Sequence, residues 1–309
     1  MTLSPRQVRD LLDEHGLAPS RALGQNFVAD PNTVRRIARL AAVGEGDRVV
    51  EIGPGLGSLT LALVETGAHV TAVELDRHLL APLRSVVEPH GVRVVHGDAM
   101  RLDWGELLAD TGAGTDIRTD TDTDSSADTD TDSSTDTGSG TPGRPWTLVA
   151  NLPYNVATPL VLDLLADVPA IGRMLVMVQR EVGERLAARP GSKAYGIPSV
   201  KVAYRADAEV VGRVPPTVFI PPPRVESALV RVQRLAEPRV DADPARLFRL
   251  VEAGFGQRRK MLRRSLAGLV DADGFERAGV RPEARAEELD LEAWGRLARL
   301  DAGESPETP

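Results

Sequence analysis

The sequence predicts an α/β protein with a mainly parallel sheet, followed by a small all-helical domain. Short apolar runs alternate with helical patterns along most of the chain, and from about residue 241 the pattern is helical throughout. Strands that alternate with helices imply a parallel sheet covered by helices on both faces. The length of 309 residues suits a large domain, expected at 1–238, a smaller one at 239–301 and a disordered tail at 302–309.

The individual elements follow in order along the chain. Strands are expected at 47–53, 69–75, 92–98, 146–151 and 173–179, and helices at 58–67, 77–91 and 157–167. Two more strands, at 199–207 and 227–235, flank the proline-rich segment 214–226 and are expected to form a hairpin-like edge of the sheet. Helical patterns then occupy 244–270 and 281–300.

Composition excludes several classes of protein. There are no cysteines, so disulfides, thiolate metal sites and a cysteine nucleophile are ruled out, and no metal is expected. The first sixteen residues are charged and lack the apolar centre of a secretory signal. No run approaches the roughly 18 apolar residues of a membrane span. A cytoplasmic protein without a membrane partner is expected.

The net charge of −8 is concentrated in one low-complexity stretch. Residues 110–140 hold nine Asp and one Arg, so the rest of the chain is neutral, with 36 basic and 36 acidic residues. This Asp/Thr/Ser/Gly repetition has almost nothing to bury, and we expect a disordered insertion over about 110–144. A calcium-binding repeat is the alternative, but the glycines and apolar residues of such repeats are missing.

A glycine-rich turn follows the first strand of the predicted sheet. Gly53, Gly55 and Gly57 have the G-x-G-x-G spacing usual for S-adenosylmethionine, whereas a dinucleotide fingerprint would require glycine at Ser58. Glu74 ends the next strand and could accept both ribose hydroxyls, and Asp98 follows the third strand and could accept from an adenine amine. The alternative is that Glu74 and Asp98 are merely solvated acids at strand ends. Their order after the glycines favours a cofactor site.

The strand at 146–151 ends in Asn151-Leu152-Pro153-Tyr154, an amide, a rigid proline and a ring. An exocyclic aromatic amine is a poor nucleophile until acceptors for its two N–H bonds pull the nitrogen toward a tetrahedral shape. The side-chain oxygen of Asn151 could be one acceptor, and the carbonyl of Leu152 or Pro153 the other. Tyr154 could stack on a flipped-out base. The alternative is an ordinary strand end with one packed tyrosine.

Five segments together resemble the ribosomal RNA adenine dimethyltransferases, most closely the bacterial small-subunit members, which dimethylate two adjacent adenosines near the 3′ end of 16S rRNA. They are "ALGQNFVADP", "VVEIGPGLGSLT", "VANLPYNVATPL", "VFIPPPRVESALV" and "GFGQRRKMLRRSL". The resemblance covers nearly the whole chain apart from the acidic insertion. It implies a Rossmann-like class I methyltransferase with a seven-stranded, mainly parallel sheet and S-adenosylmethionine as cofactor.

The resemblance also implies roles for single residues. Cofactor contacts are expected at Asn26, Val28, Gly53, Gly55, Glu74, Asp98 and Asn151. Target-base contacts are expected from Asn151, Leu152, Pro153 and Tyr154, with Phe219 as a candidate second stacking ring. Val28 replaces the family's usual Leu, and Glu226 stands where Asp is common. Asp30-Pro31 is a good helix start, so Asn26 is expected in the loop before it.

The segment 256–264 is expected to bind RNA. It holds Arg258, Arg259, Lys260, Arg263 and Arg264. Phe255, Leu262, Leu266 and Leu269 have helical spacing, which would leave the basic residues on the outer face of one helix. A merely solvated helix face is the alternative, but Arg21, Arg35 and Arg36 near the N-terminus add to a phosphate-binding surface. The expected partner is 16S rRNA within a small-subunit precursor, and a monomer is expected.

Three other functions remain open at this point. The large-subunit (23S) rRNA adenine dimethylases of the macrolide-resistance type share the Asn-Leu-Pro-Tyr and cofactor patterns. A ribosome-assembly factor could act mainly by binding, although the intact Asn151, Tyr154, Glu74 and Asp98 favour an enzyme. A small-molecule methyltransferase would leave the basic segment without a purpose.

Overall fold

The computed structural model describes residues 1–20, 23–109 and 144–300. The expected disordered segment, except residue 144, and the expected tail lie outside the described residues, as does Arg21. Among the described residues, no helix combines the length and apolar character needed to cross a membrane.

A seven-stranded sheet forms the centre of the larger domain. Its strands are β2 (Arg48–Ile52), β3 (His69–Glu74), β4 (Arg93–His96), β5 (Trp146–Asn151), β6 (Ile171–Gln179), β7 (Ala206–Val214) and β9 (Ser227–Arg234). They lie in the order β4-β3-β2-β5-β6-β9-β7. Only β9 runs antiparallel to its neighbours, β6 and β7. The predicted seven-stranded, mainly parallel sheet is therefore confirmed, and strand order reverses beside β2 and β5.

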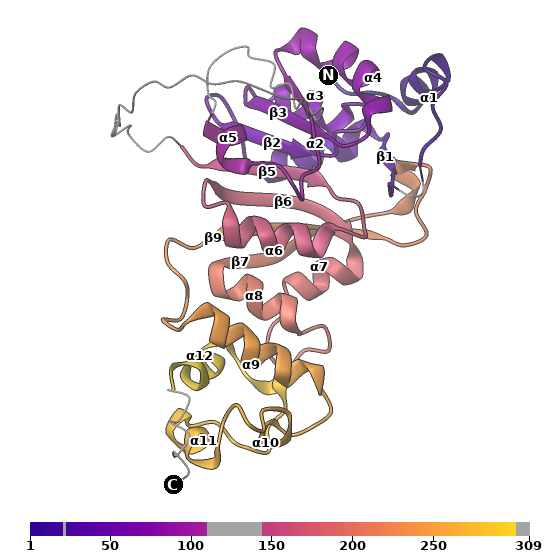
Figure 1. Ribbon diagram of the computed structural model, residues 1–309. Coiled ribbons are helices and arrows are strands. Elements are labelled where there is room, and N and C mark those ends of the chain that lie inside the picture. Colours follow the sequence, from indigo (N-terminus) through magenta and orange to yellow (C-terminus); the bar gives the residue numbers. More distant parts are fainter. Residues whose placement is uncertain (21–22, 110–143, 301–309) are drawn as a thin grey trace, which may run out of the picture.

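Helices cover both faces of this sheet, as Figure 1 shows. One apolar cluster joins the sheet to α1 (Pro5–Glu14), α2 (Pro31–Ala41), α3 (Ser58–Val64) and α4 (Arg77–Val87). The other joins it to α5 (Trp104–Ala109), α6 (Ala157–Asp167), α7 (Arg180–Leu186) and α8 (Ile197–Arg205). Successive residues of a strand point to opposite faces, so Val49 belongs to the first cluster and Val50 to the second. This two-sided burial explains the continuous apolar runs of the central strands.

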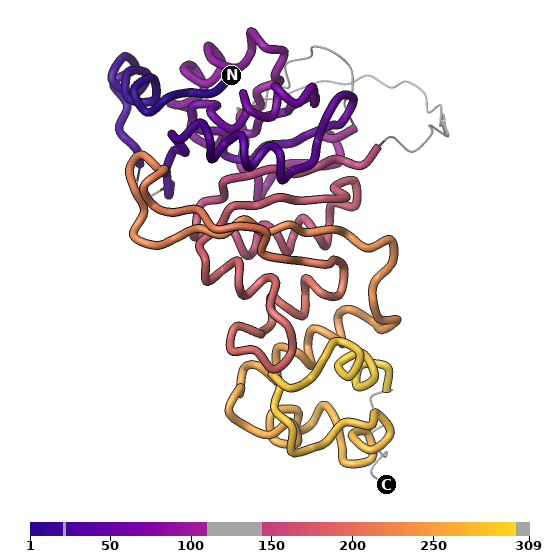
Figure 2. The backbone as a smooth tube through the Cα atoms, turned by 180° about the vertical axis from the view of Figure 1, so that it is seen from behind, coloured from indigo at the N-terminus to yellow at the C-terminus, as the bar shows by residue number. Residues whose placement is uncertain are grey.

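A small two-stranded sheet links the N-terminal segment to the connection between β7 and β9. In it, β1 (Phe27–Val28) pairs antiparallel with β8 (Phe219–Ile220). Figures 1 and 2 both show this pairing at one end of the large sheet, where the indigo and orange segments meet. Two short 3-10 helices, η1 (Glu88–His90) and η2 (Pro216–Val218), lie in the connections. Asp30 caps α2 through the amide of Thr33, so the predicted helix start is confirmed.

The strand expected at 199–207 is wrong, because these residues form most of α8 and only the start of β7. Val200, Val202 and Tyr204 alternate with less buried residues, which resembles a strand. The alternation arises because α8 is buried on two sides: Val202 packs in the core of the large domain, whereas Val200 and Tyr204 pack against the C-terminal helices. The expected antiparallel pair around the proline-rich segment is confirmed, with β7 beginning at Ala206.

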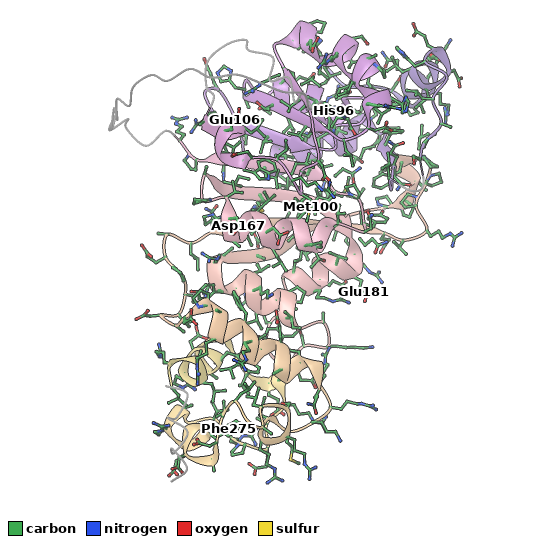
Figure 3. The ribbon with its side chains drawn as sticks, in the orientation of Figure 1. His96, Met100, Glu106, Asp167, Glu181 and Phe275 are labelled. Carbon is green, nitrogen blue, oxygen red and sulfur yellow. The ribbon has the colours of Figure 1, made fainter. Side chains whose placement is uncertain are left out.

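The C-terminal helices form a separate apolar cluster below the sheet (Figure 1). They are α9 (Pro244–Gly256), α10 (Leu262–Ser265), α11 (Ala272–Ala278), the 3-10 helix η3 (Ala286–Glu288) and α12 (Leu291–Arg299). Trp294 and Phe275, the latter labelled in Figure 3, are buried at its centre. Because this cluster includes residues of α8, the helical unit packs on the larger domain across the expected boundary near residue 238.

The single helix expected through the basic segment is also wrong. The chain leaves the α-helical path after Gly256 and resumes it at Leu262. The amides of Leu262 and Arg263 donate to the carbonyls of Ala284 and Pro282 instead of to a preceding helical turn. The tertiary contact with 282–284 therefore replaces helix continuation, and residues 257–261 form an exposed turn.

Candidate active site

A pocket opens at the carboxyl edge of β2, β3, β4 and β5, where strand order reverses and ligands bind in open α/β sheets. Its empty volume is about 1090 Å³, including open solvent. All seven residues that the sequence assigns to the cofactor line it: Asn26, Val28, Gly53, Gly55, Glu74, Asp98 and Asn151. Residues spread over 125 positions of sequence (Asn26 to Asn151) thus meet in one cavity.

The glycine turn, which connects β2 to α3, lines the pocket. Gly53, Gly55 and Gly57 all have positive φ, of 70°, 61° and 87°, which a residue with a side chain rarely adopts. A Cβ on Gly55 would lie 2.8 Å from Cδ1 of Phe27. The turn therefore requires glycine for its backbone and also for the close packing of Phe27 from β1.

Glu74 lies at the end of β3 with only 5% of its surface exposed. Its Oε2 accepts from the amide of Gly55 at 3.0 Å, and its Oε1 accepts from the amide of Asp76 at 2.8 Å. Burial raises the pKa of Glu74, and these backbone hydrogen bonds oppose the increase. Each carboxylate oxygen keeps a second lone pair, so the group can still accept from two hydroxyls of a bound ligand.

Asp98 follows β4 and is held in a tight turn. Its Oδ1 accepts from the amide of Met100 at 3.0 Å, and Arg101 lies 3.7 Å from Oδ2. Leu75 and Met100 are large apolar residues with 50% and 40% of their surface exposed, and both line the pocket; Met100 is labelled in Figure 3. Exposed apolar side chains beside an acceptor suit a flat heteroaromatic ring that carries an amine.

Asn151 ends β5, and its amide orientation is fixed by a neighbour. Nδ2 donates to the backbone carbonyl of Asn26 at 3.0 Å, and because that carbonyl can only accept, the NH₂ group must face it. The Oδ1 atom is left without a donor among the described residues. The carbonyl of Pro153 accepts from the amide of Val156, whereas the carbonyl of Leu152 receives no donor within the described ranges.

The predicted aromatic residues do not reach the wall of the pocket. Tyr154 is half-buried in the turn after β5, and its hydroxyl lies 3.2 Å from Oγ of Ser227. Phe219 is only 3% exposed and belongs to the apolar cluster that also contains Phe27 and Val28 of β1. Leu152 is also buried, while Pro153 lines the pocket beside Asn151. A stacking role for Phe219 would therefore require the β8 segment to move.

Three residues that line the pocket were not predicted from the sequence. Glu51 lines the pocket and is 1% exposed; burial raises its pKa to about 8, and its Oε2 has no partner in the described structure. Gln25 and Asp76 also line the pocket and are joined by a hydrogen bond of 2.7 Å. An acid in the middle of an apolar strand was a visible signal for Glu51, whereas nothing in the sequence pairs Gln25 with Asp76.

The basic segment lies in the C-terminal unit, away from the pocket. Arg258, Arg259, Lys260, Arg263 and Arg264 are all exposed. Arg258 bonds to Glu287 at 2.7 Å, and Arg263 lies 3.6 Å from Glu283. Arg259, Lys260 and Arg264 have no acidic partner within the described part of the chain. Arg35 and Arg36, by contrast, contact Glu65 and the carbonyl of Arg213.

The described residues contain no group of three or more His, Cys, Asp or Glu side chains placed to hold a metal ion. The polar groups that line the pocket include backbone groups, carboxylates and the Asn151 amide.

Sequence comparison finds one family and many close relatives. The family model for "Ribosomal RNA adenine dimethylase" matches residues 19–301. Proteins named ribosomal RNA small subunit methyltransferase A are similar over 96% of this chain. The one from Cutibacterium acnes is 46% identical over 93% of its own length, and the one from Leifsonia xyli is 46% identical over 97% of its own length.

Two solved structures have the same fold over most of the chain. The 23S rRNA methyltransferase ErmE is 25% identical, with a TM-score of 0.61 over 88% of this chain and 98% of that one. A dimethyladenosine transferase from Plasmodium falciparum is 20% identical, with a TM-score of 0.65 over 87% of this chain and 94% of that one. The second likeness concerns the fold alone.

Proposed function

The chain belongs to the ribosomal RNA adenine dimethylase family, and from this premise we propose that it dimethylates N6 of two adjacent adenosines in a loop near the 3′ end of 16S rRNA. The protein is an S-adenosylmethionine-dependent rRNA adenine dimethyltransferase. Relatives at 46% identity carry a small-subunit name, which supports the small-subunit substrate.

The pocket has groups that suit S-adenosylmethionine. The glycine turn lines the pocket with backbone at Gly53 and Gly55, Glu74 keeps two acceptor positions, and Asp98 lies beside exposed apolar residues. We assign Glu74 to the ribose hydroxyls, Asp98 to the adenine amine, and Asn26, Val28, Gly53, Gly55 and Asn151 to further contacts. When bound, the cofactor supplies an electrophilic methyl group on a sulfonium.

The observation that carries the proposed chemistry is the pair of free acceptors at the end of β5. With Nδ2 of Asn151 engaged by Asn26, Oδ1 of Asn151 and the carbonyl of Leu152 receive no donor from the residues that the structure describes. Both would accept from the N–H bonds of an adenine N6, which withdraws the lone pair from the ring and makes it available for attack. The rigid Pro153 holds the Leu152 carbonyl in place, since its φ is fixed by the ring.

Binding of the target base is assigned to Tyr154, with Phe219 as a second candidate ring. A base that is removed from the stack needs an aromatic or apolar surface to replace its lost neighbours. Tyr154 follows the two acceptors directly, and its hydroxyl contact with Ser227 limits the orientations of the ring. A half-buried ring so close to Leu152 is suited to contact the base that these acceptors hold.

Binding of the RNA backbone is assigned to Arg258, Arg259, Lys260, Arg263 and Arg264. Replacing Arg259, Lys260 and Arg264 by alanine should weaken RNA binding and reduce its dependence on salt, since each phosphate contact releases counterions. S-adenosylhomocysteine binding, measured by calorimetry, should not change. An unchanged salt slope in a filter-binding titration would mean that these side chains do not contact RNA.

We further propose that the protein acts as a monomer in the cytoplasm, on a precursor of the small subunit. Its substrate would be assembled there, and RNA in a folded particle would be recognised by shape and phosphates, with the target bases presented in a loop. Sedimentation of the protein alone tests the monomer.

The decisive experiment uses labelled S-adenosylmethionine and small ribosomal subunits from a strain that lacks the modification. We expect label in dimethyladenosine at two adjacent positions, and no label with Asn151→Ala. Large subunits from a strain without 23S adenine dimethylation serve as the second substrate. Labelling of the large subunit alone would favour the 23S activity, and a folded, cofactor-binding protein that labels neither would refute the proposal.

A further inference from the structure

Gln25 and Asn26 connect the two sides of the active site. The side chain of Gln25 reaches Asp76, beyond the end of β3, and the backbone carbonyl of Asn26 reaches the side chain of Asn151, at the end of β5. Two adjacent residues of one loop thus contact both the cofactor side and the substrate side of the pocket. The loop lies against Pro153 as well, because a Cβ on Gly24 would be 3.3 Å from that ring.

The hydrogen bonds of Gln25 allow only one orientation of its amide. The amide N–H of Ser20 donates to Oε1 of Gln25 at 2.7 Å, so the NH₂ group must point the other way, where it donates to Oδ2 of Asp76 at 2.7 Å. Asp76 is itself held, since its Oδ1 caps α4 through the amide of His78 and its own amide donates to Glu74.

The orientation of Asn151 depends on the same loop. The Asn26 carbonyl fixes the NH₂ group of Asn151, and only in that orientation is Oδ1 available as an acceptor. If residues 23–28 moved away, the Asn151 side-chain amide would lose the Asn26 carbonyl, its only hydrogen-bond partner among the described residues, and could rotate. A rotated amide would present a donor, which repels an amine N–H.

We propose that Gln25 is a positioning residue for methyl transfer: through Asp76 it holds the loop of residues 23–28 against the pocket, so that the Asn26 carbonyl orients the catalytic oxygen of Asn151. This inference rests on the proposed function of Asn151. It also couples the two ligands, because the residue whose carboxylate holds Gln25 donates its backbone amide to Glu74, the acid assigned to the cofactor.

Exchanging the two groups tests the pairing directly. Gln25→Glu places two carboxylates against each other, and Asp76→Asn leaves one donor without an acceptor whichever way the two amides turn. The double variant Gln25→Glu/Asp76→Asn restores every hydrogen bond: the new glutamate accepts from Ser20 and from the new asparagine, which still caps α4 through its oxygen. The net charge of the double variant equals that of the wild type.

The measurement is single-turnover methylation of unmodified small subunits together with the affinity for S-adenosylhomocysteine. We expect each single variant to lower the methyl-transfer rate by about tenfold or more, the range for losing a hydrogen bond to a charged group. The double variant should recover to within about threefold of the wild type. If Gln25 had a purely structural role, the single variants would lose thermal stability, but their methyl-transfer rate would not fall and then recover in the double variant.

Matched controls make the same chemical changes elsewhere. Gln7→Glu alters an exposed capping-box residue that tolerates glutamate, and Asp290→Asn alters the cap of α12. Neither should change the rate. Full activity of Gln25→Glu, or a double variant no better than the single ones, would overturn the proposal.

Hydrogen–deuterium exchange of residues 23–28 separates this inference from the proposed substrate. The amides of this loop should exchange faster in both single variants, and at the wild-type rate in the double variant, with S-adenosylhomocysteine bound. This readout needs no RNA, so it remains decisive if the small subunit is not the substrate. Unaltered exchange in the single variants would show that Gln25 does not hold the loop.

Discussion

Replacing Gly55 by alanine should damage the cofactor pocket through Phe27, and the cost can be worked out from the structure. The residue has φ of +61°, so an alanine there costs about 1–2 kcal/mol in the left-handed region. Restricting the unfolded chain returns about 0.4–1 kcal/mol. The new Cβ would lie 2.8 Å from Cδ1 of Phe27, and overpacking of this kind adds about 1–3 kcal/mol.

Gly16 is the matched control because it has nearly the same φ as Gly55 and no atom close to the position of an added Cβ. Its φ is +60°, and a Cβ there would meet nothing within 4 Å. Gly16→Ala should therefore lose only about 1 kcal/mol of unfolding free energy, whereas Gly55→Ala should lose about 2–4 kcal/mol. Urea unfolding of both variants measures the difference.

The functional consequence follows from the position of Phe27 in β1. Displacing the ring moves the neighbouring pocket residues Asn26 and Val28, which we assign to the cofactor, so we expect S-adenosylhomocysteine to bind about tenfold more weakly to Gly55→Ala and normally to Gly16→Ala. A second substitution, Phe27→Leu, should recover part of the affinity in Gly55→Ala. Equal destabilisation by the two alanines, with unchanged affinity in calorimetry, would refute the reasoning.

Three further predictions concern other parts of the molecule. Tyr154→Ala should reduce methyl transfer far more than cofactor affinity; equal losses in turnover and calorimetry would argue against its contact with the base. Glu51 holds its proton more tightly when folded, since burial raises its pKa from 4.5 to about 8, so wild-type stability should fall relative to Glu51→Gln as the pH rises from 4.5 to about 8. Parallel pH profiles of urea unfolding would contradict this. Deleting residues 111–142 should leave methylation largely intact, and an inert or unfolded product would show that the segment has a structural role.

The sequence by itself determined the fold class and the strand-end residues that line the pocket. In a parallel sheet the carboxyl ends of neighbouring strands meet at one edge, so a residue at the end of a strand can be placed from its position in the chain alone. Glu74 and Asp98 could be predicted for this reason, and so could the glycine turn. Asn151 belongs to the same group, because the strand that it ends lies beside the strand before that turn.

Only the tertiary structure decided what surrounds these residues, because it brings together segments whose contacts leave no periodic signal. The helix α8 resembles a strand in sequence since it is buried against both the sheet and the C-terminal helices. The basic segment turns after Gly256 because the amides that follow it find distant carbonyls. The orientation of the Asn151 amide depends on a backbone oxygen 125 residues away, and a hydrogen bond to a carbonyl can be made by any residue type, so no side chain marks it in the sequence.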